Sequence, residues 1–194
     1  MRAHAQTNSG RSEFDPDELR AAQRGEHGAL RRLVEHHTRP VFALLSRLLG
    51  PAGHGESVED LAQETMLRVT TAVGRFDPSG PARLSTWVLT IATRLGLQHL
   101  KRRRPAIVAP ATPIPSPLPS PEAHLCADQL RLHVQTVVAE LSPEVRAAFV
   151  LADAHGMTPA EVAAALEIPP GTARTRIHRA RQRIRAALDR GDGA

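Results

Sequence analysis

The residues most able to do chemistry form a series of arginines near the C-terminus. Residues 174–185 hold six arginines, and no acidic residue lies between Ile168 and Leu188. A guanidinium group binds phosphate and can hold guanine through two parallel hydrogen bonds, so this series favours nucleic-acid binding. A solvated helix face would normally include acidic residues at i,i+4 spacing, and their absence argues against that alternative.

Helical angles separate these arginines by direction. At about 100° per residue, one side of the segment is apolar; it holds Ala173, Ile177, Ala180, Ile184 and Leu188. The opposite side holds Thr172, Thr175, Arg176, Arg179 and Arg183. The flanks hold Arg174, His178, Arg181 and Arg185. We expect the outward side to contact base edges, while the long side chains of the flanks can lie over apolar surface or reach a phosphate.

Histidines and a single cysteine raise the alternative of metal binding or catalysis. The chain has 10 His and 1 Cys. The pair His36-His37 and the trio His124, Cys126 and His133 match no structural zinc spacing, and no nucleophile lies beside a base. We therefore expect surface histidines, no catalytic residue, no metal ligand and no cofactor.

The arginine series must be positioned by the helices before it. Residues 123–190 predict a four-helix, winged-helix-like unit with a first helix over 123–141 and a second starting at Ser142-Pro143. Thr158 and Glu161 form a capping box for a short helix. A turn over 167–171 then leads to a longer basic helix opened by Thr172. This order predicts a helix-turn-helix, whose second helix enters the DNA major groove.

Residues 15–104 predict a second all-helical unit. Asp15-Pro16 starts its first helix, a helix over 29–49 is interrupted near Pro40, and Ser57 and Ser85 cap two more. In the helix after Ser57, an inward stripe lies opposite a polar face of Asp60, Gln63, Glu64 and Arg68. In the helix after Ser85, one face holds Trp87, Ile91, Arg94, Gln98 and Lys101. Opposite it lies a core stripe of Val88, Ala92, Leu95 and Leu100.

Between the two units the sequence changes character. Residues 105–121 contain seven prolines in 17 positions, which blocks a helix and favours an extended conformation. We expect a linker over 105–122 that holds two separately folded domains apart; a rigid loop packed on one domain is the alternative.

Composition and length exclude some classes of protein. The chain has 194 residues and a net charge of +5. It has no apolar run near the roughly 20 residues of a membrane span and no signal peptide, so we expect no membrane insertion and a cytoplasmic location. Residues 1–14 are polar, and we expect a disordered tail there.

The sequence resembles the extracytoplasmic-function sigma factors of bacterial RNA polymerase. Asp60-Leu61-Ala62-Gln63-Glu64 is similar to the D-x-x-Q-E signature of sigma region 2. Residues 75–78 (RFDP) and 87–92 (WVLTIA) resemble two further region 2 segments. Residues 172–181 (TARTRIHRAR) resemble the region 4 motif. The ordered set spans nearly all of residues 15–188.

The resemblance implies partners and roles for these residues. The implied partners are core RNA polymerase, promoter DNA and an anti-sigma factor. The chain would contact the polymerase at its β′ clamp and its β flap. The polymerase-binding face would be Asp60, Gln63, Glu64 and Arg68, although an ordinary solvated face is the alternative. The minus-35 element would meet Thr172, Arg174, Thr175, Arg176 and Arg179. The melted minus-10 element would meet Phe76, Trp87, Arg94, Gln98 and Lys101, with Trp87 equally suited to the core.

The sequence departs from the family in the minus-10 segment. Where the family has Asn and Asp, this chain has Arg94 and Gln98. The change makes the face more basic, which favours phosphate affinity over base reading. A rival interpretation is a helix-turn-helix regulator that acts without polymerase, but it leaves the region 2 motifs unexplained.

Overall fold

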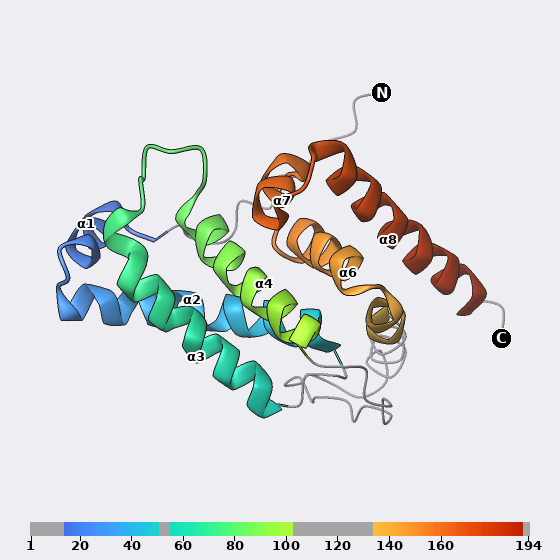
Figure 1. Cartoon of the computed structure of the whole chain (residues 1–194), viewed down its shortest axis with the longest axis horizontal. Coiled ribbons are helices and arrows are strands. Elements are labelled where there is room, and N and C mark those ends of the chain that lie inside the picture. The colour runs from blue at the N-terminus through green and yellow to red at the C-terminus, as the bar shows by residue number, and fades with distance from the viewer. Residues whose placement is uncertain (1–13, 51–54, 103–133, 192–194) are drawn as a thin grey trace, which may run out of the picture.

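The structure, a computed structural model, describes residues 14–50, 55–102 and 134–191 (Figure 1). These ranges contain helices and turns and no strand, which confirms the predicted all-α class. The predicted linker and all but one residue of the predicted tail lie outside them. The helices are α1 (Pro16–Gln23), α2 (His27–Leu49), α3 (Gly55–Ala72), the 3-10 turn η2 (Val73–Arg75), α4 (Leu84–Arg102), residues 134–140, α6 (Pro143–Phe149), the π-helical η3 (Val150–Ala154), α7 (Pro159–Leu166) and α8 (Pro170–Gly191).

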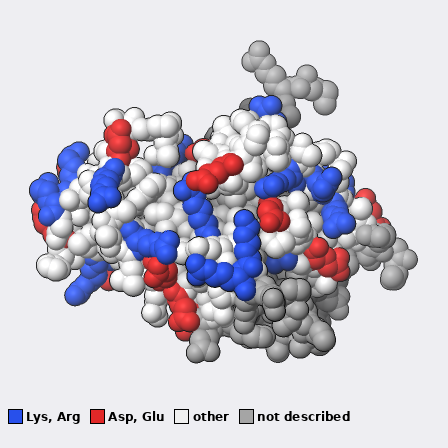
Figure 2. Space-filling view, viewed as in Figure 1, with Lys and Arg blue, Asp and Glu red and all other residues white. Residues whose placement is uncertain are grey.

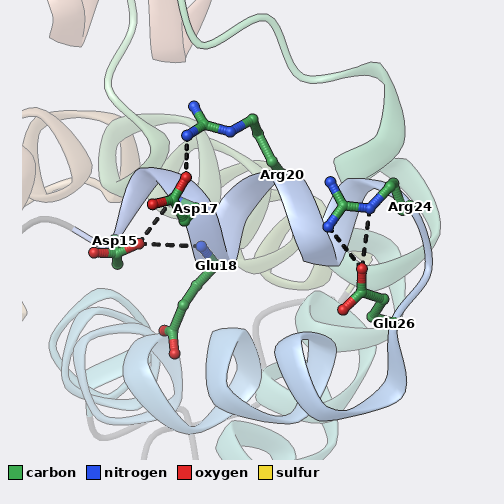
Figure 3. A network of polar contacts seen from close by, with 6 residues as sticks. All are labelled: Asp15, Asp17, Glu18, Arg20, Arg24 and Glu26. Atoms are coloured by element: carbon green, nitrogen blue, oxygen red, sulfur yellow. Dashed lines mark hydrogen bonds and ion pairs between the residues drawn. The ribbon is translucent and has the colours of Figure 1, made fainter.

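Helix α1 begins at the predicted cap. The Asp15 carboxylate accepts hydrogen bonds from the backbone N–H groups of Asp17 at 2.8 Å and Glu18 at 3.1 Å (Figure 3). Pro16 occupies the first helical position, where its missing N–H costs no helical bond. Beyond the helix, Arg24 donates to Glu26 Oε1 through Nε at 3.0 Å and Nη2 at 2.7 Å. These contacts fix the turn into α2.

Helix α2 runs through Pro40 without a break, so the predicted interruption there is wrong. Proline removes one helical hydrogen bond, but the apolar stripe on both sides of it is buried and keeps the helix in register. Leu33 and Val41, on either side of the proline, have 0% exposure. Two predicted caps also lie inside helices, because α3 begins at Gly55 and α4 at Leu84.

One buried residue of α2 is a histidine, so the expectation that the histidines lie at the surface is wrong for His37. His37 is 2% exposed, its ring lies 4.8 Å from that of His36, and Phe14 packs beside both. Its Nε2 has no hydrogen-bond partner within the described part of the chain. Burial, with a smaller contribution from the charge of His36, lowers the pKa of His37 from 6.5 to about 4.

We expect the free energy of unfolding to fall as pH drops from 6.5 to about 4, because the unfolded chain then protonates His37 and the folded chain does not. The loss at pH 5.5 is about 1 kcal/mol. Urea unfolding at several pH values measures it. His37→Leu should flatten this part of the profile and His36→Gln should retain it; equal slopes for wild type and His37→Leu would contradict the assignment.

Helix α4 lies across α2 and α3 and forms the centre of the N-terminal unit (Figure 1). Val88 and Ala92 are fully buried, as the stripe predicts, and Leu100 is half-buried. A Cβ atom on Gly96 would lie 2.7 Å from Leu48 Cδ2, so the glycine lets α4 approach α2 closely.

The C-terminal unit contains the predicted helix-turn-helix. Thr158 Oγ1 accepts from the Glu161 N–H at 3.2 Å, and Glu161 Oε2 accepts from the Thr158 N–H at 2.8 Å, which confirms the capping box. Helix α8 begins at Pro170, so the turn is residues 167–169 and is shorter than predicted. Glu167 closes α7 in the left-handed conformation, with φ 54° and ψ 46°.

The two units pack against each other instead of being held apart, so that prediction is corrected. Helices α6 and α7 lie beside α4, and α8 lies at the outer edge (Figure 1). Buried side chains of both units, among them Val88 and Leu151, belong to one apolar cluster. A proline-rich linker constrains only its own backbone, and apolar surface on each unit drives them together.

A buried arginine lies where the units meet. Arg146 is 7% exposed, and its Nη1 donates to the Leu48 carbonyl at the end of α2 at 2.9 Å. The same guanidinium donates to three carbonyls of its own unit, those of Val138, Ala139 and Leu141. Gly50, with φ 55°, makes room, because a Cβ there would lie 2.9 Å from Arg146 Nη1. Helix C-termini carry partial negative charge, which suits a buried cation.

Candidate functional site

The outward side of α8 borders an open hollow of about 500 Å³. Four of the five predicted minus-35 readers line it, and the hollow is bounded by Pro169, Gly171, Thr172, Thr175, Arg176 and Arg179. The fifth, Arg174, is exposed but does not line the hollow. The start of α8 therefore presents hydroxyl and guanidinium groups around one concave surface.

The other side of α8 anchors these groups. Ala173, Ile177 and Ala180 are buried as predicted, whereas Ile184 and Leu188 are only half-buried. On the flank, Arg181 is paired with Asp153 of η3, with Nε 3.0 Å from Oδ1. The buried residues and this ion pair hold the helix with its arginine-bearing side at the surface.

The predicted polar face of α3 lies at the surface. Asp60, Gln63 and Arg68 are exposed and Glu64 is half-buried. Arg68 Nε lies 2.7 Å from Glu64 Oε1, which is the i,i+4 pair expected of an ordinary surface helix. Asp60 and Gln63 show no such pairing among the contacts given for the described residues, and they are available to a partner.

The predicted minus-10 face divides between surface and core. Arg94, Gln98 and Lys101 are exposed on α4. Trp87 is half-buried against the core, so it keeps both of the interpretations that the sequence left open.

Phe76 does not belong to that face, and its predicted stacking role is corrected. It is 9% exposed, and its ring packs 5.3 Å from that of Trp87. Gln23 Nε2 donates to the Phe76 carbonyl at 2.6 Å and fixes the backbone there. A ring enclosed in this way has no free surface for a base. The ring packs against Trp87 instead.

A groove between α3 and α4 joins the two predicted sites of the N-terminal unit. It measures about 530 Å³ and is lined by Leu67, Arg68, Thr71, Ala72, Arg75, Ile91 and Arg94. Leu67 is 64% exposed, which is unusual for a large apolar side chain. Leu67, Thr71 and Arg75 were missed from the sequence, although the i,i+4 spacing of Leu67 and Thr71 places them on one side of α3, and Arg75 follows in η2. Three arginines make the groove suitable for phosphate groups.

Charge is distributed unevenly over this surface. In the view of Figure 2, basic side chains gather over α4, and acidic side chains lie over the lower part of α3. The acidic part corresponds to the helix that carries Glu59, Asp60 and Glu64, and the basic part to the helix that carries Arg94, Lys101 and Arg102. One surface of the unit is thus suited to a basic partner and its neighbour to an anionic one.

Arg94 also contacts the other unit. Its Nε donates to the Ala165 carbonyl of α7 at 3.3 Å, and its Nη2 lies 3.1 Å from Glu167 Oε1. Thr86, on the preceding turns of α4, has its hydroxyl 3.4 Å from Glu161 Oε1. The helix-turn-helix is therefore docked on the face that the sequence assigns to minus-10 DNA.

The residues that the structure describes offer no candidate site for a metal ion. No group of three His, Cys, Asp or Glu residues is placed there to hold an ion. The trio His124, Cys126 and His133 lies outside those ranges. Among the described helices, none has both the length and the apolar character of a membrane span.

Both helical units match known protein families. Residues 33–105 match the family Sigma-70 region 2, and residues 131–184 match Sigma-70, region 4. The chain is 31% identical over 174 residues to ECF RNA polymerase sigma factor SigC of Mycobacterium tuberculosis, covering 89% of this chain and 90% of that protein. It is 37% identical over 161 residues to ECF RNA polymerase sigma factor SigE of Mycolicibacterium smegmatis, covering 80% of this chain and 60% of that protein.

The fold has a solved counterpart. RpoE of Bartonella quintana, solved in complex with the anti-sigma factor NepR, superposes with a TM-score of 0.65 at 20% identity, covering 82% of this chain and 96% of that one. The two helical units and their sequence matches define an RNA polymerase sigma factor of the sigma-70 class. More narrowly, the chain belongs to the extracytoplasmic-function family of sigma factors.

Proposed function

We propose that this sigma factor binds core RNA polymerase through the outward face of α3 and carries it to promoters that it reads with α4 and α8. The observation that carries the proposal is the hollow at the start of α8. Thr172, Thr175, Arg176 and Arg179 surround it on a helix whose opposite side is buried. Helix-turn-helix proteins contact base edges with this part of the second helix.

For the minus-10 element, the surface of α4 suits a melted strand. Trp87 offers part of a ring for stacking, and Arg94 and Lys101 offer cations for the backbone. The groove beside it adds Arg68 and Arg75. Because Arg94 and Gln98 stand where the family has Asn and Asp, we infer that this surface gains phosphate affinity at the expense of base reading.

For the polymerase, Asp60, Gln63, Glu64 and Arg68 are the proposed contacts with the β′ clamp. The acidic character of this part of α3 suits a basic partner surface, which would also speed association. The C-terminal unit is proposed to meet the β flap. No catalytic residue, metal or cofactor enters this function.

Regulation by a second protein follows from the same kinship. We infer an anti-sigma factor as a partner of this chain, by analogy with the complex of Bartonella quintana RpoE with NepR. A sigma factor works where polymerase and DNA are, so we place its activity in the cytoplasm.

A pull-down with the tagged full chain tests the proposal. Core polymerase subunits should be retained at moderate salt and lost from a matched Asp60→Arg chain. Retention of DNA without polymerase would favour the alternative, a helix-turn-helix regulator that acts alone.

A further inference from the structure

Gln23, the last residue of α1, contacts the segment that joins α3 to α4. Helix α1 lies beside η2 (Figure 1). The Gln23 side-chain amide donates from Nε2 to the Phe76 carbonyl at 2.6 Å and to the Val73 carbonyl at 3.3 Å. Both carbonyls can only accept, so the NH2 group of the amide, and not its oxygen, must face them. A half-buried side chain of α1 is thereby bonded to a segment 50 residues away.

The two carbonyls lie where the helical backbone ends. Phe76 follows η2 and, with φ −70° and ψ 127°, turns the chain into the extended conformation. The Val73 carbonyl also accepts from the Phe76 N–H at 3.0 Å, which closes the last turn. Carbonyl groups at the end of a helix lack a helical partner. The amide of Gln23 supplies a donor from another element and fixes the direction of the backbone at Phe76.

The side chain of Phe76 connects this backbone to α4. Phe76 is 9% exposed, and its ring centroid lies 5.3 Å from that of Trp87, at an interplanar angle of 45°. Trp87 occupies the first turn of α4 and is half-buried. Because the Phe76 ring is packed in place, it limits the orientations that the indole ring can take.

Trp87 lies beside groups that suit a single strand of DNA. Ile91 is one turn further along the same side of α4, and it lines the groove between α3 and α4 together with Arg94. An unpaired base stacks on an aromatic ring, while guanidinium groups bind the phosphates beside it. Stacking is stronger on a ring that is already held, because ordering a mobile side chain during binding costs free energy.

We propose that Gln23 is a positioning residue for promoter melting: through Phe76 it holds the ring of Trp87 in the orientation in which an unpaired minus-10 base stacks on it. Gln23 acts without touching the DNA, and α1 thereby takes part in DNA opening. This role rests on the proposed function, because it takes Trp87 as a contact of the melted strand.

Two substitutions of Gln23 remove the donor in different ways. Gln23→Met keeps the length and the helix propensity of the side chain but leaves both carbonyls without the amide. Gln23→Glu places a carboxylate oxygen against two carbonyl oxygens, none of which can donate. The matched controls are Gln135→Met and Gln135→Glu, which make the same changes at an exposed position of the C-terminal unit.

Tryptophan fluorescence of the full chain measures the first step, since Trp87 is its single tryptophan. Gln23→Met should shift the emission to longer wavelength and increase quenching by acrylamide, whereas Gln135→Met should change neither. Gln23→Glu should have a larger effect near neutral pH than near about pH 5, each compared with wild type at the same pH. A protonated carboxyl group can donate to the Phe76 carbonyl, and a carboxylate cannot.

Binding of a mixed-sequence single-stranded oligonucleotide measures the second step. The full chain is bound to core polymerase, and binding by core polymerase alone is subtracted. Gln23→Met should lower the apparent affinity about 2- to 10-fold, which corresponds to the cost of ordering one side chain. In a Phe76→Leu background the same substitution should lower it less than about twofold, because the connection to Trp87 is already lost.

Two results would overturn the positioning role: unchanged emission and quenching in Gln23→Met, or changed emission with unchanged oligonucleotide affinity. Trp87→Leu separates this failure from failure of the proposed function. If Trp87→Leu lowers oligonucleotide affinity and Gln23→Met does not, the role of Gln23 alone is refuted. If Trp87→Leu binds the oligonucleotide as tightly as wild type, Trp87 is no minus-10 contact, and that part of the proposed function is refuted.

Discussion

Asp60→Arg is expected to weaken binding of core polymerase by about 100-fold or more while leaving the fold intact. The side chain is exposed on α3, beside Glu59 and Glu64, and its replacement adds a cation where the partner surface is proposed to be basic. Like charges placed opposite each other in an interface cost several kcal/mol. A binding titration of labelled chain with purified core polymerase measures the loss.

The control for this experiment is Glu35→Arg, which makes the same charge change at an exposed position of α2. It should bind polymerase within about twofold of wild type, since exposed charges distant from an interface have little effect. Gln63→Ala should show a smaller loss than Asp60→Arg. Thermal unfolding followed by circular dichroism checks the fold of each variant. Normal polymerase affinity in well-folded Asp60→Arg would remove α3 as the docking face.

The second large effect concerns base reading by α8. Arg176→Ala or Arg179→Ala should each weaken binding to the minus-35 element by about 1 to 3 kcal/mol, with relaxed preference at one base pair. Both residues line the hollow at the start of the helix. A guanidinium that binds guanine bidentately discriminates against other bases, whereas one that binds phosphate does not. Titrations on duplexes with single base changes distinguish the two roles.

Arg185 provides the matched control. It is exposed further along α8, beyond the hollow, and should contact phosphate at most. Arg185→Ala should weaken binding to all duplexes about equally and reduce the salt slope by about one. If Arg176→Ala and Arg179→Ala behave in the same way, both arginines hold phosphate, and Thr172, Arg174 and Thr175 remain as readers.

Local signals in the sequence predicted the elements of this fold well. The Thr158 to Glu161 capping box and the apolar spacing of Ala173, Ile177 and Ala180 depend on residues a few positions apart, and the structure contains both. The exposed positions on α3 and α4 follow from the same periodicity. The interruption expected at Pro40 failed, because packing on both sides of the proline outweighs one lost hydrogen bond.

Such local signals could not predict contacts between residues that are distant in the sequence. Nothing in the spacing of Arg146 indicates that it reaches the Leu48 carbonyl, and nothing near Arg94 points to Glu167. Phe76 was expected to offer a stacking platform because its loop precedes α4, but its ring packs on Trp87 and its carbonyl accepts from Gln23, two residues from other parts of the chain. Docking depends on the shapes of two finished surfaces, which periodicity within one helix cannot describe.

Transcription with purified components tests the central claim most directly. Core polymerase is incubated with the full chain on fragmented genomic DNA, and the 5′ ends of the transcripts are sequenced. We expect start sites that share minus-35 and minus-10 elements and that disappear with core polymerase alone or with Asp60→Arg. The claim would be contradicted if the start sites do not change when the chain is added at concentrations that saturate polymerase.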